Sequence, residues 1–347
     1  MRIIVNDIAA SKGGAMTVLK QFYDYIREND TQNEWIFMLG EKYLEETQNI
    51  KVECFPQIKS SRIKKLLFDC FFGKRIVNKF NPDIILSLQN IIVFGAKVPQ
   101  MVYIHQSIPF QDVKKFSFLK GDERPLAIVQ HLIGFLIKLS AKKANKVFVQ
   151  TEWMREAVAT KVGIAREKII TTFPEIELFE LDKNKFDSKR FFYPTGNLTY
   201  KNINSIVKAC DILNARGMDD FEVRLTLSEG TVKHKNIKCI DYIGRERLQL
   251  EYQSATLVFP SYIETIGLPL LEARSCETIV LASDMPFSRE GIEDYENGYF
   301  FNPFKPEELA KLMEKVICGE IQRRTDTVKL PGKQNGWAKL VEEVIRF

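Results

Sequence analysis

Two glutamates eight residues apart, Glu264 and Glu272, stand on either side of an expected helix start. The apolar run Thr256–Phe259 predicts a strand before them, and the segment after Gly267 predicts a helix. The amides of a helix start attract anions, because they have no partner within the helix. We expect a phosphate at the amides of Thr265, Ile266, Gly267 and Leu268. A carboxylate binds hydroxyl groups through its two acceptor oxygens, so the pattern predicts a ligand with both phosphate and hydroxyls.

A second polar loop runs from Tyr193 to Asn202, between a predicted strand and a predicted helix. Lys201 in this loop could neutralise a departing diphosphate. Asn197 in the same loop can only hydrogen-bond. The alternative for Lys201 is a lysine in a solvated turn.

Two features of the N-terminal half add candidates. Gly13 and Gly14 follow the apolar run Ile3–Val5 and precede an apolar-periodic segment, an order typical of a strand, a glycine loop and a helix. His105 ends the predicted strand Gln100–Ile104, where a polar side chain can meet a ligand. A plain turn and a structural histidine are the respective alternatives.

Short apolar runs alternate with helix-length segments along the whole chain, which predicts parallel sheets covered by helices on both faces. With 347 residues, two domains are expected. The predicted fold class is α/β, with two Rossmann-like doubly wound domains facing a central cleft. The boundaries predicted are 1–172 and 173–333, with a final helix in 334–347 that packs back on the first domain; the polar region 174–190 is expected to connect the two.

The segment from Glu264 to Glu272 resembles the E-x7-E signature of the retaining glycosyltransferases of family 4, which have the GT-B fold. The resemblance implies that Glu264 contacts the transferred sugar and Glu272 the nucleotide ribose. It implies that the amides between them hold the diphosphate, and that Asp241-Tyr-Ile-Gly244 resembles the base pocket, with backbone groups of Tyr242 or Ile243 reading the base. Gly196 and Lys201 match the family's phosphate loop, in which Asn197 stands where arginine is usual. Gly13, Gly14 and His105 resemble residues of the same family that approach the donor or the acceptor.

The function that this resemblance implies is transfer of a sugar from a nucleoside diphosphate donor, with UDP as the expected nucleotide and with retention of anomeric configuration. The acceptor would be a glycan or a lipid-linked oligosaccharide in the synthesis of bacterial surface polysaccharide. No D-x-D motif occurs, so neither a metal nor another cofactor is expected. A non-catalytic nucleotide-sugar-binding protein and a nucleotide-sugar epimerase of the same fold are the alternatives.

The positive charge is concentrated in the N-terminal half. Residues 51–150 hold 17 Lys and Arg against 6 Asp and Glu, although the whole chain has a net charge of only +5. Regions 60–80 and 113–120 interleave these cations with bulky apolar residues, a pattern that favours an anionic membrane surface over nucleic acid. A core-facing helix with a solvated lysine face is the alternative. We therefore expect a cytoplasmic protein, peripheral on the inner face of the cytoplasmic membrane, and we expect its six scattered cysteines to lie in the core.

Overall fold

The computed structural model describes the chain except for residues 12, 174–178, 180–185 and 326–335. The chain divides into two compact units. Unit 1 contains Met1–Glu175 and Gln334–Phe347, and unit 2 contains Ile176–Lys333. The expected connection at 174–190 lies largely outside the described residues.

Unit 1 is built on a parallel sheet with the strand order β3-β2-β1-β4-β5-β6-β7 in its described part. Its strands are β1 (Arg2–Asp7), β2 (Glu34–Leu39), β3 (Ile50–Cys54), β4 (Ile84–Ser87), β5 (Gln100–Ile104), β6 (Lys146–Val149) and β7 (Ile169–Thr171). Its α-helices are α1 (Gly14–Asn29), α2 (Pro56–Lys59), α3 (Arg62–Leu67), α4 (Gly73–Val77), α5 (Arg124–Ala127), α6 (Gly134–Lys143), α7 (Glu152–Val162) and α13 (Gly336–Ile345). The prediction omitted β3 and β7.

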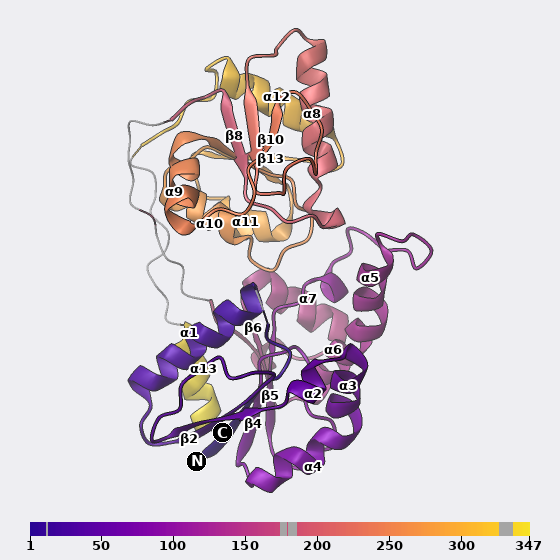
Figure 1. Ribbon diagram of the computed structural model, residues 1–347, viewed down its shortest axis with the longest axis vertical. Helices are drawn as coiled ribbons and strands as arrows, with labels where there is room; N and C mark the ends of the chain where they lie inside the picture. Colours follow the sequence, from indigo (N-terminus) through magenta and orange to yellow (C-terminus); the bar gives the residue numbers. More distant parts are fainter. Residues whose placement is uncertain (12, 174–178, 180–185, 326–335) are drawn as a thin grey trace. The chain divides into compact units, whose positions relative to one another are not determined.

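The helices of unit 1 cover both faces of its sheet (Figure 1). Helices α1 and α13 pack on one face, where Phe22 and Trp337 meet at a ring-centroid distance of 5.6 Å. The other face is covered by α4 and by α6 and α7. Because α13 contributes four buried side chains to the first of these cores, unit 1 is assembled from the two ends of the described chain. Those side chains are Trp337, Leu340, Val341 and Val344.

Two helical stretches of unit 1 contain a π-helical turn. Phe68–Phe72 joins α3 to α4, and Ile128–Ile133 joins α5 to α6. The second stretch forms a helix from Arg124 to Lys143 that is long and apolar enough to cross a membrane by length and composition alone. A core helix of a water-soluble protein can meet the same criterion, and Ile137 and Ala141 of this helix are buried against the sheet.

Unit 2 repeats the architecture with a parallel sheet in the order β10-β9-β8-β11-β12-β13 in its described part. The strands are β8 (Arg190–Tyr193), β9 (Glu222–Leu225), β10 (Ile237–Cys239), β11 (Thr256–Phe259), β12 (Val280–Ser283) and β13 (Gly298–Phe301). The helices are α8 (Ile203–Ala215), α9 (Arg245–Ser254), α10 (Leu268–Ser275), α11 (Pro286–Ile292) and α12 (Pro306–Ile317). Helix α8 packs against α12, while α9, α10 and α11 form a row (Figure 1). The two Rossmann-like domains confirm the predicted fold class, although β13 was not predicted.

The cysteines do not all lie in the core as expected. Cys210 and Cys276 are buried, whereas Cys54 and Cys318 are exposed. Cys54 ends the edge strand β3 and Cys318 follows the last residue of α12, so the sheet edge and the helix end leave both side chains in contact with water.

Candidate active site

The loops that follow β8 and β11 lie side by side because these two strands are neighbours in a parallel sheet. The Tyr262 amide donates to the Tyr200 carbonyl at 3.1 Å, and the Asn202 side chain donates to the Pro260 carbonyl at 3.2 Å. These bonds tie the lysine loop after β8 to the glutamate loop after β11. The sequence predicted each loop separately, and the structure brings them together.

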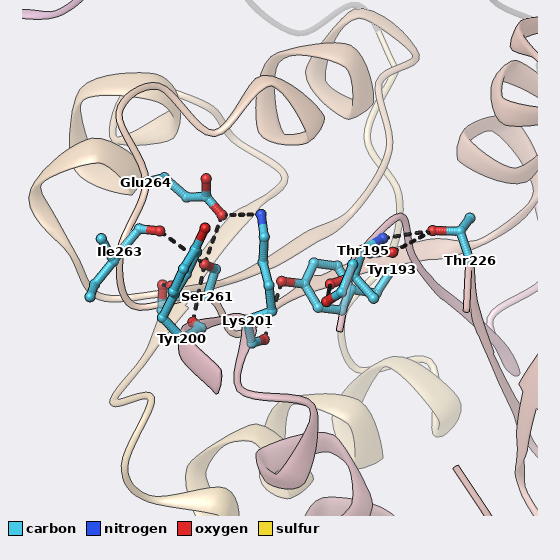
Figure 2. Close-up of polar contacts among 10 residues, drawn as sticks. Tyr193, Thr195, Tyr200, Lys201, Thr226, Ser261, Ile263 and Glu264 are labelled. Carbon is cyan, nitrogen blue, oxygen red and sulfur yellow. Dashed lines mark hydrogen bonds and ion pairs between the residues drawn. The ribbon is translucent and has the colours of Figure 1, made fainter. Parts of the chain in front are cut away.

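Lys201 and Glu264 form an ion pair between these loops (Figure 2). The Lys201 ammonium lies 2.5 Å from Glu264 Oε1, and the Ser261 hydroxyl donates to the same oxygen at 2.7 Å. The side chains of Lys201 and Glu264 are 19% and 17% exposed, so the pair is sheltered but reachable from solvent. This arrangement holds one cation and one carboxylate together at the carboxyl end of the sheet.

Two tyrosines fix the backbone and the surroundings of Lys201. The buried Tyr193 hydroxyl donates to the Lys201 carbonyl at 3.2 Å. The Lys201 ammonium lies 5.7 Å from the centroid of the Tyr200 ring, where the ring face attracts a cation. Burial, and then the Glu264 charge, raise the pKa of Tyr200 to about 12, so its hydroxyl stays neutral beside the pair.

Gly267, three residues after Glu264, is the residue from which α10 starts. Its φ of 75° lies in the left-handed region that side chains disfavour. A Cβ at this position would also lie 3.0 Å from Leu270 Cδ1. The glycine therefore turns the chain into α10, and the segment Thr265–Leu268 becomes the helix start that the sequence predicted for a phosphate.

Glu272 lies in α10 and accepts a hydrogen bond from the Tyr252 hydroxyl at 2.7 Å. Glu272 is partly exposed, while Tyr252 in α9 is buried. Glu272, which was expected to contact the ribose, is therefore already hydrogen-bonded to a tyrosine of the neighbouring helix.

The remaining candidates of unit 2 lie in loops after β8 and β10. Gly196 and Asn197 are both exposed, and the Leu198 amide donates to the Gly196 carbonyl at 3.0 Å. Tyr242 is 93% exposed, whereas the Ile243 side chain is buried. A tyrosine ring so open to solvent could stack on a planar ligand as well as offer its backbone.

In unit 1, Gly13 has a φ of 63° and a ψ of −147°, a conformation open essentially to glycine alone. Helix α1 begins at the next residue, Gly14. Apart from the chain neighbours of each glycine, no atom of the described residues lies within 4 Å of where its Cβ would stand. A ligand could therefore approach the backbone of this loop closely at the start of α1.

His105 follows β5 and is held by Asn90, which comes after β4. The Asn90 Oδ1 accepts the His105 backbone N–H at 2.8 Å, and its Nδ2 lies 3.2 Å from His105 Nε2. Because the amide nitrogen donates, Nε2 accepts and the ring proton is on Nδ1. Burial lowers the pKa of His105 to about 4, so the imidazole is neutral at physiological pH.

A buried polar cluster lies at the end of β1, close to these residues in the fold of unit 1. Burial raises the pKa of Asp7 to about 7, although the charge of Lys65 opposes the shift. Lys65 is ion-paired with Asp69, whose pKa burial raises to about 6. The Gln89 side chain donates to Asp69 at 3.2 Å and accepts from the Ala9 amide at the same distance. The cluster connects α3 to the strand ends.

The two basic regions of unit 1 expose large apolar side chains. Ile63 is 70% and Phe71 67% exposed in the region 60–80. Region 113–120 has no regular secondary structure, and Leu119 in it is 97% exposed. Leu132 and Phe135 of the helix Arg124–Lys143 are also exposed, although the sequence did not single them out.

Comparison with known proteins identifies the family of unit 2. Residues 177–329 match the family model of glycosyl transferases group 1. Unit 2 belongs to the glycosyl transferases group 1 family. Its ion pair, its helix start and the Tyr252–Glu272 bond all lie within the matched residues.

Relatives of this chain include glycosyltransferases named for O-antigen and capsular polysaccharide. The O-antigen chain mannosyltransferase RfbU of Salmonella typhimurium is 23% identical over 235 residues, which are 63% of this chain and 64% of RfbU. The capsular polysaccharide biosynthesis glycosyltransferase CapM of Staphylococcus aureus is 20% identical over 277 residues, which are 72% of this chain and 69% of CapM. The match thus spans a little under two thirds of RfbU.

Among solved structures, Anabaena HepE in complex with UDP and glucose superposes with a TM-score of 0.67 at 15% identity over the whole of both chains. WaaG, a glycosyltransferase involved in lipopolysaccharide biosynthesis, gives a TM-score of 0.64 at 12% identity, covering 91% of this chain and 90% of WaaG. At these identities the likeness shows the fold, which is GT-B.

Three side chains next to the predicted residues were not predicted as site residues. Ser261 precedes Glu264 by three residues, and a hydroxyl in the loop after a buried strand is a signal that could have found it. Asn90 stands in a positive-φ conformation after β4, a position where asparagine is favoured. Tyr252 lies twenty residues before Glu272 on another helix, so no local spacing relates the two.

Proposed function

We propose that this chain is a retaining glycosyltransferase that moves a sugar from a nucleoside diphosphate, with UDP-sugar as the donor, to a glycan or lipid-linked acceptor. The Lys201–Glu264 pair at the neighbouring ends of β8 and β11 carries this proposal. It puts a cation for a phosphate and a carboxylate for a sugar hydroxyl within one hydrogen bond of each other.

The roles follow from the charges that the reaction creates. When the sugar–phosphate bond breaks, its electrons go to the leaving diphosphate, which becomes more negative. Lys201 and the amides at the start of α10 stabilise that charge. Glu264 orients the sugar through its hydroxyls, and the leaving phosphate accepts the acceptor's proton, which gives transfer on the same face and retention.

These positive groups take the part that a divalent metal has in other transferases, so we propose that transfer needs no metal. Among the residues that the structure describes, no group of three or more His, Cys, Asp or Glu could hold a metal ion. Turnover that is unchanged after dialysis against EDTA is expected, and activity restored only by Mg²⁺ or Mn²⁺ would contradict this part of the proposal.

The experiment that tests the activity begins with thermal shift against UDP-, GDP- and ADP-sugars, because a donor that binds the native state raises its melting temperature. The stabilising donor, radiolabelled in its sugar, is then incubated with lipid-linked acceptors from a bacterial membrane extract. Incorporation with the donor's anomeric configuration supports the proposal. Binding without turnover would indicate a nucleotide-sugar-binding protein, and conversion of the donor without an acceptor would indicate an epimerase.

We further propose that unit 1 binds the anionic inner surface of the cytoplasmic membrane, where a lipid-linked acceptor would be found. The support is the exposure of Ile63, Phe71 and Leu119 among the cations of regions 60–80 and 113–120. Apolar side chains can enter the interface while lysines meet the lipid phosphates. The similarity to an O-antigen chain mannosyltransferase and to a capsular polysaccharide biosynthesis glycosyltransferase supports an acceptor of this kind.

Vesicle sedimentation tests this surface. The protein should pellet with vesicles that contain phosphatidylglycerol and stay in solution with pure phosphatidylcholine. Replacing Ile63 and Phe71 by serine should lower the bound fraction several-fold, whereas Phe304→Ser, at an apolar position of unit 2 that is 54% exposed, should not. Equal binding to both kinds of vesicle, or an equal effect of Phe304→Ser, would contradict the membrane proposal.

A further inference from the structure

The bond from Tyr252 to Glu272 joins two helices of unit 2. Tyr252 lies in α9 and Glu272 in the neighbouring α10, and the hydroxyl donates to Glu272 Oε2 at 2.7 Å. The family resemblance implies that Glu272 contacts the nucleotide ribose. A bond to its carboxylate therefore acts on the nucleotide end of the site, away from the Lys201–Glu264 pair that faces the reacting bond.

The Tyr252 ring is held on several sides. It is 1% exposed, and its centroid lies 5.5 Å from that of Phe192 in an edge-to-face contact and 5.8 Å from that of Phe179. The Thr278 hydroxyl donates to the Tyr252 carbonyl. With ring and backbone both fixed, the hydroxyl points in one direction, and the carboxylate that it meets loses rotational freedom.

The chemistry of the pair suits a fixed acceptor of hydroxyl groups. Burial, and then the charge of Glu272, raise the pKa of Tyr252 far above its usual range, so the phenol remains a donor. A carboxylate has about four lone-pair positions, and the bond from the Tyr252 hydroxyl occupies one of them. A carboxylate already aimed loses less entropy when the nucleotide binds.

We propose that Tyr252 is a positioning residue for the nucleotide ribose, acting through Glu272. The proposal rests on the proposed function, because it needs a ribose-containing donor. It assigns to α9 a role in nucleotide affinity, whereas the Lys201–Glu264 pair acts on the bond that breaks.

Binding of UDP and of its 2′-deoxy and 3′-deoxy forms, measured by calorimetry, tests the proposal. Tyr252→Phe removes the hydroxyl and keeps the ring. It should weaken UDP binding roughly three- to tenfold. It should leave unchanged the affinity for the deoxy form that lacks the hydroxyl bound by Glu272. In a Glu272→Ala background, Tyr252→Phe should add no further loss.

Tyr295→Phe is the matched control, because Tyr295 is also buried in unit 2 and donates its hydroxyl to the Thr278 carbonyl at 2.8 Å. It should leave the affinity for all three nucleotides unchanged. The melting temperature of each variant establishes that it is folded.

The outcomes separate the two proposals. If the wild type binds UDP and Tyr252→Phe binds it equally well, or loses the same factor for all three nucleotides, the role of Tyr252 is wrong and the proposed function stands. If the wild type binds neither UDP nor GDP nor ADP, the proposed function fails, and the role of Tyr252 fails with it.

Discussion

The ammonium of Lys201 and the carboxylate of Glu264, 63 residues apart in sequence, meet at 2.5 Å across two loops of one domain. Each residue thereby restricts the other before any ligand arrives. In the proposed reaction a diphosphate bound to Lys201 would share the lysine with Glu264, so binding of the phosphate and orientation of the sugar would be coupled through one side chain.

Lys201→Ala and Glu264→Gln should each lower transfer by roughly 10²–10³-fold, because one removes charge stabilisation and the other a sugar contact. The double variant should lose much less than the product of the two factors, because the residues act as a pair. The measurement is kcat/KM for the donor. Lys189→Ala removes an exposed ion pair with Asp220 in the same unit and should be as active as the wild type. Full additivity in the double variant would contradict the coupling.

Gly267→Ala should destabilise the protein by more than the roughly 1–2 kcal/mol of a left-handed residue, because the added Cβ would also crowd Leu270. Gly319→Ala is the control, since Gly319 has a φ of 74° and no described residue beyond its chain neighbours lies within 4 Å of its Cβ position. Urea denaturation of the two variants measures the difference. Equal losses would mean that packing at the start of α10 tolerates a side chain.

His105 should make unit 1 less stable in mild acid. Its pKa is lowered to about 4 in the folded state, against about 6.5 in the unfolded chain. Below pH 6.5 the unfolded chain binds more protons, so this stabilising contribution is complete above pH 6.5 and is lost as the pH falls toward 4. The melting temperature of His105→Gln should fall less steeply across that range than the melting temperatures of the wild type and of His131→Gln, a variant at an exposed histidine. Parallel profiles for the wild type and His105→Gln would contradict this prediction.

Asp7 should have the opposite effect on stability. Its pKa of about 7 lies above the usual carboxyl range, so the folded state keeps a proton that the unfolded chain has released. The stabilising contribution is complete below about pH 4 and is lost as the pH rises through 7. The free energy of unfolding of Asp7→Asn, minus that of the wild type, should therefore be larger at pH 8 than at pH 5. Urea denaturation at the two pH values measures this difference, with Asp24→Asn, at a half-exposed side chain, as the control variant.

Much of the fold could be predicted from the sequence because the central strands are continuous apolar runs between helix-length segments. The strands that were not predicted lack this signal. In β3 of unit 1, polar residues alternate with apolar ones at the sheet edge, and β7 has three residues. In unit 2, β13 begins with a glycine and is the edge strand next to β12.

The site was predictable only to the extent that its residues cluster in sequence. Glu264, Gly267 and Glu272 stand within nine residues, and a strand-loop-helix pattern identifies them. The contact between Lys201 and Glu264 depends on the order of the strands, which residue types do not specify. The bonds from Asn90 to His105 and from Tyr252 to Glu272 depend on tertiary packing between separate elements.

The position of α13 has a consequence for how the protein is made. The core under α1 needs Trp337 and Val344, and these residues follow the whole of unit 2 along the chain. During synthesis on the ribosome, unit 2 can therefore complete its fold before unit 1 does, although unit 1 is translated first. Until residues 336–345 emerge, nascent unit 1 presents an uncovered apolar surface, the kind of surface to which chaperones bind.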